Sequence, residues 1–338
     1  MPTIKEVAAL AGVSIGTVSH VLSGVRRVHP AIRVKVEEAV RQLGYRPNHI
    51  ARSLKSKRTR ALGMVISDIT NPFFPELMRG AEDAALARGY LLTTFNTDDS
   101  PDRERQIFEL LESRRMDGLL VVVALKRGKH PHVGKALEDG IPVVCLDRRP
   151  RDLAVDSVTV DNAGGVEAAI DYLIAEGYRD IAYVGGAPEM YLTADRLKGY
   201  KRAMTKAGLA WRVFDGDFRR ESGYRLMREW LTGSRLPEAV FTANILMAAG
   251  VLEALHEQGL SVPGDIALAS FDSVAILKGF RPELTAVAQP TYEMGFRGAN
   301  LLMDRLEGLA PSPEPQHVQL PCELRIAEST RRARTLTA

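Results

Sequence analysis

The sequence predicts a protein of the α/β class, with a small helical domain at the N-terminus and a larger core of parallel β-sheets flanked by helices. Apolar residues recur at helical spacing over the first 45 residues. From residue 61, short apolar runs alternate with amphipathic stretches. The charge divides in the same place, because residues 1–60 contain 12 Lys and Arg but three Asp and Glu (+9), whereas the remainder of the 338 residues carries −6.

The composition excludes several classes of protein. Apolar residues make up 45% and charged residues 26%, as in an ordinary globular protein. The sequence contains no run of 18 apolar residues, so no membrane span is predicted, and the N-terminus does not resemble a secretory signal. The two cysteines, Cys145 and Cys322, form no spaced cluster, so we expect no disulfide framework and no cysteine-based zinc site. These features predict a cytoplasmic protein without a metal or cofactor.

The basic N-terminal part begins with two short predicted helices, over residues 4–11 and 15–22. Gly12 between them can adopt the left-handed conformation that ends a helix, and Ser14 can cap the next one. Two short helices joined by a glycine-containing turn form a helix-turn-helix. A small bundle with a solvated charged surface is the alternative, but the +9 charge favours a nucleic-acid partner.

A third helix is predicted from Pro30 to the stop at Gly44. A short helix then follows over residues 49–55, where Asn48 can be the cap, and a basic linker leads to the first core strand at residue 61. A helix of about seven residues is too short to be stable alone in water.

The core is predicted to contain repeated βα units, which imply parallel sheets covered on both faces. The predicted strands are residues 62–67, 91–95, 118–123, 142–146, 181–185, 239–243 and 266–271. Helices are predicted between most of them, for example over residues 75–88, 102–113, 166–175 and 246–257. Ligands of such sheets bind beyond the carboxyl ends of the strands.

The residues at or near these strand ends are polar or aromatic. They are Asn71, Phe73, Phe74, Asp147, Arg148, Arg196, Phe218, Asn244, Asp272 and Gln289. Amides, carboxylates and guanidinium groups bind neighbouring hydroxyls, and aromatic faces pack against the C–H side of a sugar ring. Individually these residues could equally be loop caps, a surface ion pair or core. Together they predict a small polyhydroxylated ligand. His130 and His132 form a weak candidate metal pair, for which the sequence shows no third ligand.

The stretches TIKEVAALAGVSIGTVSHVL and YRPNHIARSLK resemble the LacI/GalR family of bacterial transcription repressors, and the similarity continues through nearly the whole chain. The resemblance implies that the second helix enters the major groove, where Ile15 can contact a thymine methyl and His20 a base edge. It also implies that two copies of the 49–55 segment fold on DNA as hinge helices, with Leu54 wedged into a base step; an ordinary core leucine is the alternative. The DNA-contacting residues would be Ser14, Ile15, Gly16, Thr17, Ser19, His20, Arg26, Ala51, Leu54 and Lys55.

The core is similar to periplasmic sugar-binding proteins, and the ten strand-end residues correspond to positions that hold the pentose in ribose-binding proteins. The resemblance implies a DNA-binding domain (1–47), a hinge helix and linker (48–60) and a core (61–338). The core would comprise an N-subdomain (about 61–161 and 291–321) and a C-subdomain (about 162–290 and 322–338). A ribose-like effector is the first choice. Met190 and Leu192 disfavour a purine, and Ile245 departs from the family's usual Asp.

These expectations combine into a ligand-responsive repressor. Closure of the two subdomains on an effector would shift the N-subdomains of a homodimer and alter its grip on a near-palindromic operator. The sequence does not decide whether the effector releases the DNA (induction) or strengthens its binding (corepression). A hexose, a sugar phosphate or a nucleoside is the alternative effector. A transport-type sugar carrier, a sugar or nucleoside hydrolase, and a repressor controlled by a protein partner are the competing classes. For the hydrolase, spacing identifies no nucleophile, base or metal set.

Overall fold

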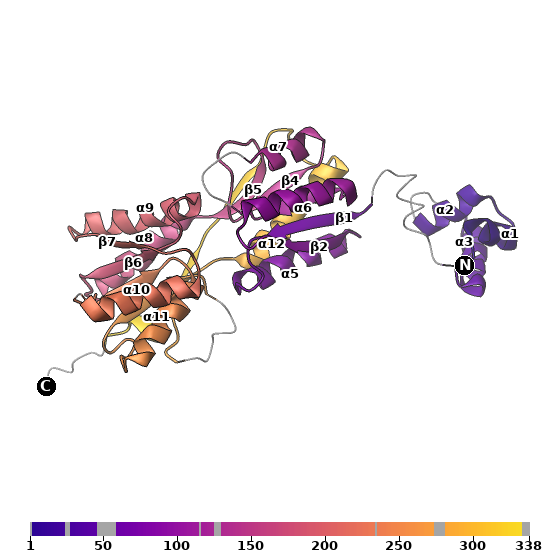
Figure 1. Ribbon diagram of the computed structural model, residues 1–338. Helices are drawn as coiled ribbons and strands as arrows, with labels where there is room; N and C mark the ends of the chain where they lie inside the picture. Colours follow the sequence, from indigo (N-terminus) through magenta and orange to yellow (C-terminus); the bar gives the residue numbers. More distant parts are fainter. Residues whose placement is uncertain are drawn as a thin grey trace. The chain divides into compact units, whose positions relative to one another are not determined.

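The protein divides into two units, residues 1–60 and 61–338, which are described separately. The structure is a computed structural model and describes residues 2–23, 28–45, 59–114, 116–124, 130–233, 235–273 and 281–332 (Figure 1). Within these residues, no helix is both long enough and apolar enough to cross a membrane.

The N-terminal unit is a bundle of three helices around a small apolar core. Helix α1 begins with a capping box, in which the Thr3 amide donates to Glu6 at 2.6 Å and the Thr3 hydroxyl accepts from the Glu6 amide at 3.4 Å. It ends at Gly12, whose φ of 65° is left-handed. The helices are α1 (Ile4–Ala11), α2 (Ile15–Ser23) and α3 (Pro30–Leu43), and their fully buried residues are Val7, Val18 and Val36. The predicted helix-turn-helix is therefore confirmed.

The first subdomain of the larger unit, the N-subdomain, contains a six-stranded sheet of order β11-β5-β4-β3-β1-β2 (Figure 1). Successive side chains of strand β1 point to opposite faces of the sheet, so they pack in two different hydrophobic clusters. Met64 packs in the cluster that includes Leu77 of α5 and Leu302 of α12, and Val65 packs with Phe108 of α6. The strands are β1 (Ala61–Ile66), β2 (Leu91–Asn96), β3 (Gly118–Val121), β4 (Val143–Leu146), β5 (Asp156–Val160) and β11 (His317–Leu320). The helices are α5 (Phe73–Ala87), α6 (Pro101–Arg114), α7 (Pro131–Glu138) and α12 (Thr291–Glu307).

The second subdomain, the C-subdomain, repeats this plan with a sheet of order β12-β10-β9-β8-β6-β7. Its strands are β6 (Ile181–Gly185), β7 (Arg212–Asp215), β8 (Ala239–Thr242), β9 (Ala267–Phe271), β10 (Thr285–Ala288) and β12 (Glu323–Arg325). Its helices are α8 (Asn162–Ala175), α9 (Tyr191–Lys206), α10 (Arg220–Gly233), α11 (Ile245–Glu257) and the 3₁₀ turn Glu328–Thr330.

The chain passes between the subdomains three times, after β5, after β10 and after β11. One strand differs from the expected parallel arrangement, because β12 pairs antiparallel with β10. Only Pro321 and Cys322 separate β11 from β12. The carboxyl ends of the parallel strands of both sheets line the same cavity. The chain leaves the first sheet at the carboxyl end of β11 and enters the second sheet at the same edge. Strand β12 therefore runs opposite to its neighbour β10.

Helices α5 and α12 pack so closely that glycine is needed on both. A Cβ added to Gly295 would lie 1.9 Å from the Leu77 carbonyl oxygen, and one added to Gly80 would lie 2.0 Å from that of Tyr292. Backbone atoms cannot rotate away as a side chain can, so any larger residue separates the helices.

We expect Gly295→Ala to lower the free energy of unfolding by about 1–3 kcal/mol, the usual cost of overpacking. Urea denaturation followed by circular dichroism measures it. Gly134→Ala is the matched control, because that helical Cβ would lie an ordinary 3.7 Å from Leu153 and alanine favours a helix by up to about 1 kcal/mol. Equal stability of wild type and Gly295→Ala would show that the helices can separate at little cost.

Candidate ligand-binding cleft and nucleic-acid interface

A cavity lies between the two subdomains and is lined by all ten of the strand-end residues singled out in the sequence. Both subdomains contribute to it. The ten are Asn71, Phe73, Phe74, Asp147, Arg148, Arg196, Phe218, Asn244, Asp272 and Gln289. Side chains more than 200 positions apart in the sequence therefore meet in one place, as expected for the carboxyl ends of parallel strands.

Backbone strain is concentrated at this cavity. Asp99, Asp147, Phe218 and Asp272 have φ values of 56°, 61°, 69° and 72°, in the left-handed region that non-glycine residues rarely adopt. All four line the cavity. Each such residue costs on the order of 1–3 kcal/mol, and such strain is typical of sites where side-chain direction matters more than stability.

Arg196 provides a buried positive charge at the cavity and is 2% exposed. Its Nε donates to Asn162 Oδ1 at 2.8 Å, and its Nη1 donates to the Ala243 carbonyl. The guanidinium carbon lies 3.6 Å from the centre of the Phe271 ring, a cation–π contact. These three contacts from different elements hold the side chain rigidly in place.

Two buried carboxyl groups, Asp147 and Asp272, lie near this charge. Burial raises the pKa of each above its ordinary value of 3.8, and the positive charge of Arg196 opposes that rise. Gln289 Nε2 donates to Asp272 Oδ1 at 2.5 Å, and Arg148 Nη1 donates to Asp99 Oδ1 at 2.5 Å. The cavity therefore has acceptors and donors already fixed by neighbouring groups.

Several buried polar atoms of the cavity have hydrogen-bonding capacity left over. Among the described residues these are Ser67 Oγ, Asp147 Oδ1, Arg148 Nε and Gln289 Oε1. An unpaired buried polar group costs about 1–3 kcal/mol, so a cluster of them calls for an explanation. A ligand with several hydroxyl groups, each both donor and acceptor, would satisfy them.

One of the ten residues, Asn244, also has the capping role that the sequence left as an alternative, and Asn71 makes a local hydrogen bond to the backbone. Asn244 caps α11, since its Oδ1 accepts from the Met247 amide at 2.9 Å, and its Nδ2 donates to the Phe218 carbonyl at 2.7 Å. Asn71 Oδ1 accepts from the Phe73 amide at 3.0 Å. Ile245 after Asn244 thus leaves the helix cap intact. Both asparagines shape the cavity wall through the backbone.

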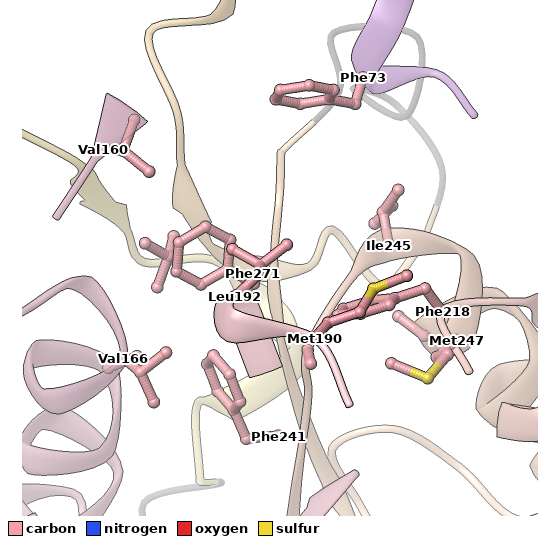
Figure 2. Close-up of a cluster of buried hydrophobic side chains, with 14 of the residues drawn as sticks. Phe73, Val160, Val166, Met190, Leu192, Phe218, Phe241, Ile245, Met247 and Phe271 are labelled. Atoms are coloured by element: carbon pink, nitrogen blue, oxygen red, sulfur yellow. The ribbon is translucent and has the colours of Figure 1, made fainter. Parts of the chain in front are cut away.

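The apolar residues that line the cavity are Phe73, Phe74, Leu192 and Phe218. Figure 2 shows Phe73, Leu192 and Phe218 among a cluster of buried hydrophobic side chains. Phe73 and Phe74 pack edge to face with ring centres 5.1 Å apart. Phe218 lies against Gly186, where an added Cβ would be 2.0 Å from the ring. Figure 2 shows Leu192 near the centre of the apolar cluster. Flat aromatic faces beside fixed polar groups are the combination expected for a sugar ring.

Six other residues line the cavity: Ser67, Asp68, Asp99, Leu192, Asp217 and Arg219. Sequence reasoning considered Leu192 as unfavourable to a purine and missed the other five. Asp99 follows β2, so the strand-end rule applied to that strand would have found it. The sequence also failed to reveal a carboxylate beside His132, since Glu104 Oε1 lies 2.6 Å from its Nε2. Within the described part of the chain, no three metal-binding side chains cluster together.

The candidate DNA-binding residues lie at the start of α2 and along its accessible side. Ser14 Oγ accepts from the Thr17 amide at 3.1 Å, which caps the helix. Ser14, Gly16 and Ile15 are exposed, the last at 45%, whereas Thr17, Ser19 and His20 are half-buried. Arg26, Ala51, Leu54 and Lys55 lie outside the described residues.

Comparison with known proteins identifies the family. Residues 3–48 match the family described as "Bacterial regulatory proteins, lacI family", and residues 170–330 match "Periplasmic binding protein-like domain". The ribose operon repressor of Escherichia coli (strain K12) is 38% identical over 324 residues, which cover 95% of this chain and 97% of that protein. The chain belongs to the lacI family. It is a DNA-binding transcription regulator and not an enzyme, as the sequence predicts.

Solved structures of transcriptional regulators match over most of their length. A complex of the transcriptional regulator CelR with cellobiose is 34% identical, with a TM-score of 0.73, and the match covers 97% of this chain and 100% of that one. A LacI family transcriptional regulator from Enterococcus faecium with bound ribose is 27% identical, with a TM-score of 0.72, covering 80% and 98%. The match to CelR covers nearly the whole of this chain, so it includes residues of both units.

Proposed function

We propose that this lacI-family regulator is a repressor whose operator affinity is controlled by a ribose-like monosaccharide bound between the two subdomains. The observation that carries the proposal is the convergence of ten side chains from both subdomains, with unpaired buried polar atoms, on one cavity. The ribose named for the Escherichia coli repressor and bound in the Enterococcus faecium structure supports a pentose as the first choice.

The size of the cavity indicates how the effector would enter. Its volume is about 40 Å³, which is room for about three water molecules on the scale on which one water needs about 10–15 Å³. A monosaccharide therefore needs the subdomains to move apart and then close around it. The three connecting segments between the subdomains allow such a hinge motion.

On the DNA side, we propose that a homodimer places two copies of α2 in successive major grooves of a near-palindromic operator. Ile15 and His20 would face base edges, while Ser14, Thr17 and Ser19 would lie near phosphates. Arg26 and the segment containing Ala51, Leu54 and Lys55 would add loop and minor-groove contacts. This role assigns the protein to the cytoplasm, where the bacterial chromosome lies.

Calorimetry with ribose, other pentoses, hexoses, cellobiose, ribose 5-phosphate and purines tests the effector assignment. We expect measurable heats with a pentose and none with purines, because Met190 and Leu192 are apolar. Operator binding, measured with and without the bound sugar, then distinguishes induction from corepression. Tight binding of a purine or a sugar phosphate, with no response to free sugars, would replace the proposed effector class.

Effector affinity should also depend on pH. The raised pKa values of Asp147 and Asp272 mean that these carboxylates take up protons at a higher pH than an ordinary Asp does. Protonation removes the charged acceptors for sugar hydroxyls, so affinity should fall as pH decreases toward those raised pKa values and recover as pH increases. Calorimetry over a pH series measures this. An Asp272→Asn variant should bind more weakly but with a shallower pH dependence; a steeper one would mean that another group titrates.

A further inference from the structure

A loop of the N-subdomain makes a direct ionic contact with the C-subdomain outside the ten residues of the site. Arg151 follows β4 in the loop that leads to β5, and Asp195 lies in the second turn of α9. Arg151 Nη2 lies 2.8 Å from Asp195 Oδ1 and 3.0 Å from Oδ2. One guanidinium nitrogen thus contacts both oxygens of a carboxylate on the other subdomain.

An aromatic ring on the same helix adds to this contact. The guanidinium carbon of Arg151 lies 4.8 Å from the centre of the Tyr191 ring, a cation–π distance. Tyr191 and Asp195 are four positions apart in α9, so both point to the same side of the helix. All three residues line a hollow of about 450 Å³, which shares Asp147, Arg148 and Leu192 with the effector cavity.

The loop that carries Arg151 is anchored to its own subdomain. Pro150 is buried, Leu153 packs against the N-subdomain core, and Asp152 Oδ1 lies 4.0 Å from His130 Nε2. The same loop begins with Arg148, whose side chain lines the effector cavity. Because the loop is held in place, its backbone loses little freedom when Arg151 pairs with Asp195, and separation of the subdomains must break the pair.

We propose that Arg151, Asp195 and Tyr191 form a clasp that holds the two subdomains closed around the effector and slows its release. The inference rests on the proposed function, in which the effector lies between the subdomains. Arg151 and Asp195 have side-chain exposures of 52% and 42%, so water screens the pair. The clasp therefore adjusts the lifetime of the complex without being essential for binding.

Stopped-flow measurement of ribose dissociation tests the clasp. We expect Arg151→Ala and Asp195→Ala each to accelerate release about three- to tenfold, with little change in the association rate. The reversed pair, Arg151→Asp with Asp195→Arg, should recover part of the loss, which a purely structural role for either residue would not produce. Arg220→Ala and Glu253→Ala are matched controls, because that ion pair (2.6 Å, exposures 49% and 36%) lies within the C-subdomain. Release rates within twofold of wild type in both single variants would overturn the inference.

A measurement without ligand separates this inference from the proposed effector. Spin labels at Arg105 of α6 and Arg225 of α10, in a variant with both cysteines replaced by serine, report the separation of the subdomains. We expect a broader distance distribution in Arg151→Ala than in the parent, whether or not ribose binds. If no sugar binds the wild type but the distribution still broadens, the effector assignment fails and the clasp stands. An unchanged distribution would reject the clasp.

Discussion

Replacing Arg196 with alanine is expected to weaken effector binding by about 100-fold or more, which corresponds to about 2.7 kcal/mol. Arg196 is 2% exposed, its guanidinium lies against Phe271, and its charge opposes the rise in pKa of the buried Asp147 and Asp272. Its loss removes charged hydrogen bonds worth about 1.5–3 kcal/mol each. It also leaves Asp147 and Asp272 without the positive charge that favours their ionised form. Calorimetry with the preferred sugar measures the effect.

Two companion variants make this result specific. Asp272→Ala should also abolish the effector response, whereas Arg196→Lys should recover little, because an ammonium group cannot reproduce the planar contact with Phe271. Both alanine variants should have the operator affinity of the sugar-free wild type, and circular dichroism should show that they fold. Full sugar affinity in Arg196→Ala would place the effector somewhere other than this cavity.

Replacing Leu54 with alanine is expected to weaken operator binding by at least about tenfold while leaving sugar affinity unchanged. Leu54 lies among Arg52, Ser53 and Lys55 in the sequence, and little apolar sequence follows to bury it. An apolar side chain inserted between base steps permits a bend that increases contact, so its loss costs a few kcal/mol at most. Fluorescence anisotropy with a labelled operator at fixed salt concentration measures the change, since salt strongly affects such affinities.

The matched control for this experiment is Leu309→Ala. Leu309 is 64% exposed in the core unit, so its truncation removes an apolar side chain of the same size without affecting either proposed site. Both variants should bind sugar as the wild type does. Wild-type operator affinity in Leu54→Ala would show that the 49–55 segment does not insert this leucine into DNA.

Local patterns predicted most of the fold because each one depends on neighbouring residues. The predicted caps at Gly12, Ser14 and Gly44 and the 3.6-residue period define the three N-terminal helices. Alternating βα units predicted the layered core, and the strand-end rule, together with the family resemblance, brought ten cavity residues into view. The alternation of strands and helices and the positions of strand ends both follow from the order of residues along the chain, so they can be read from the sequence.

The parts that were missed depend on contacts between distant segments. Glu104 and His132 are 28 positions apart and meet because α6 and α7 cover the same face of a sheet. Strand β12 has three residues, too few for a periodic pattern, and its direction follows from the arrangement of both sheets. Arg151 and Asp195 come from different subdomains, so only their relative placement reveals the ion pair.

The repeated passage of the chain between the subdomains has a consequence for how the protein emerges from the ribosome. Helix α12 covers α5 and β4, and β11 completes the same sheet, yet both follow the whole central part of the C-subdomain. The N-subdomain therefore cannot finish folding until almost the entire polypeptide has been made. The three-helix unit is complete after about 45 residues and can fold early during synthesis. A nascent chain would therefore contain a folded DNA-binding unit well before the effector-binding core is complete.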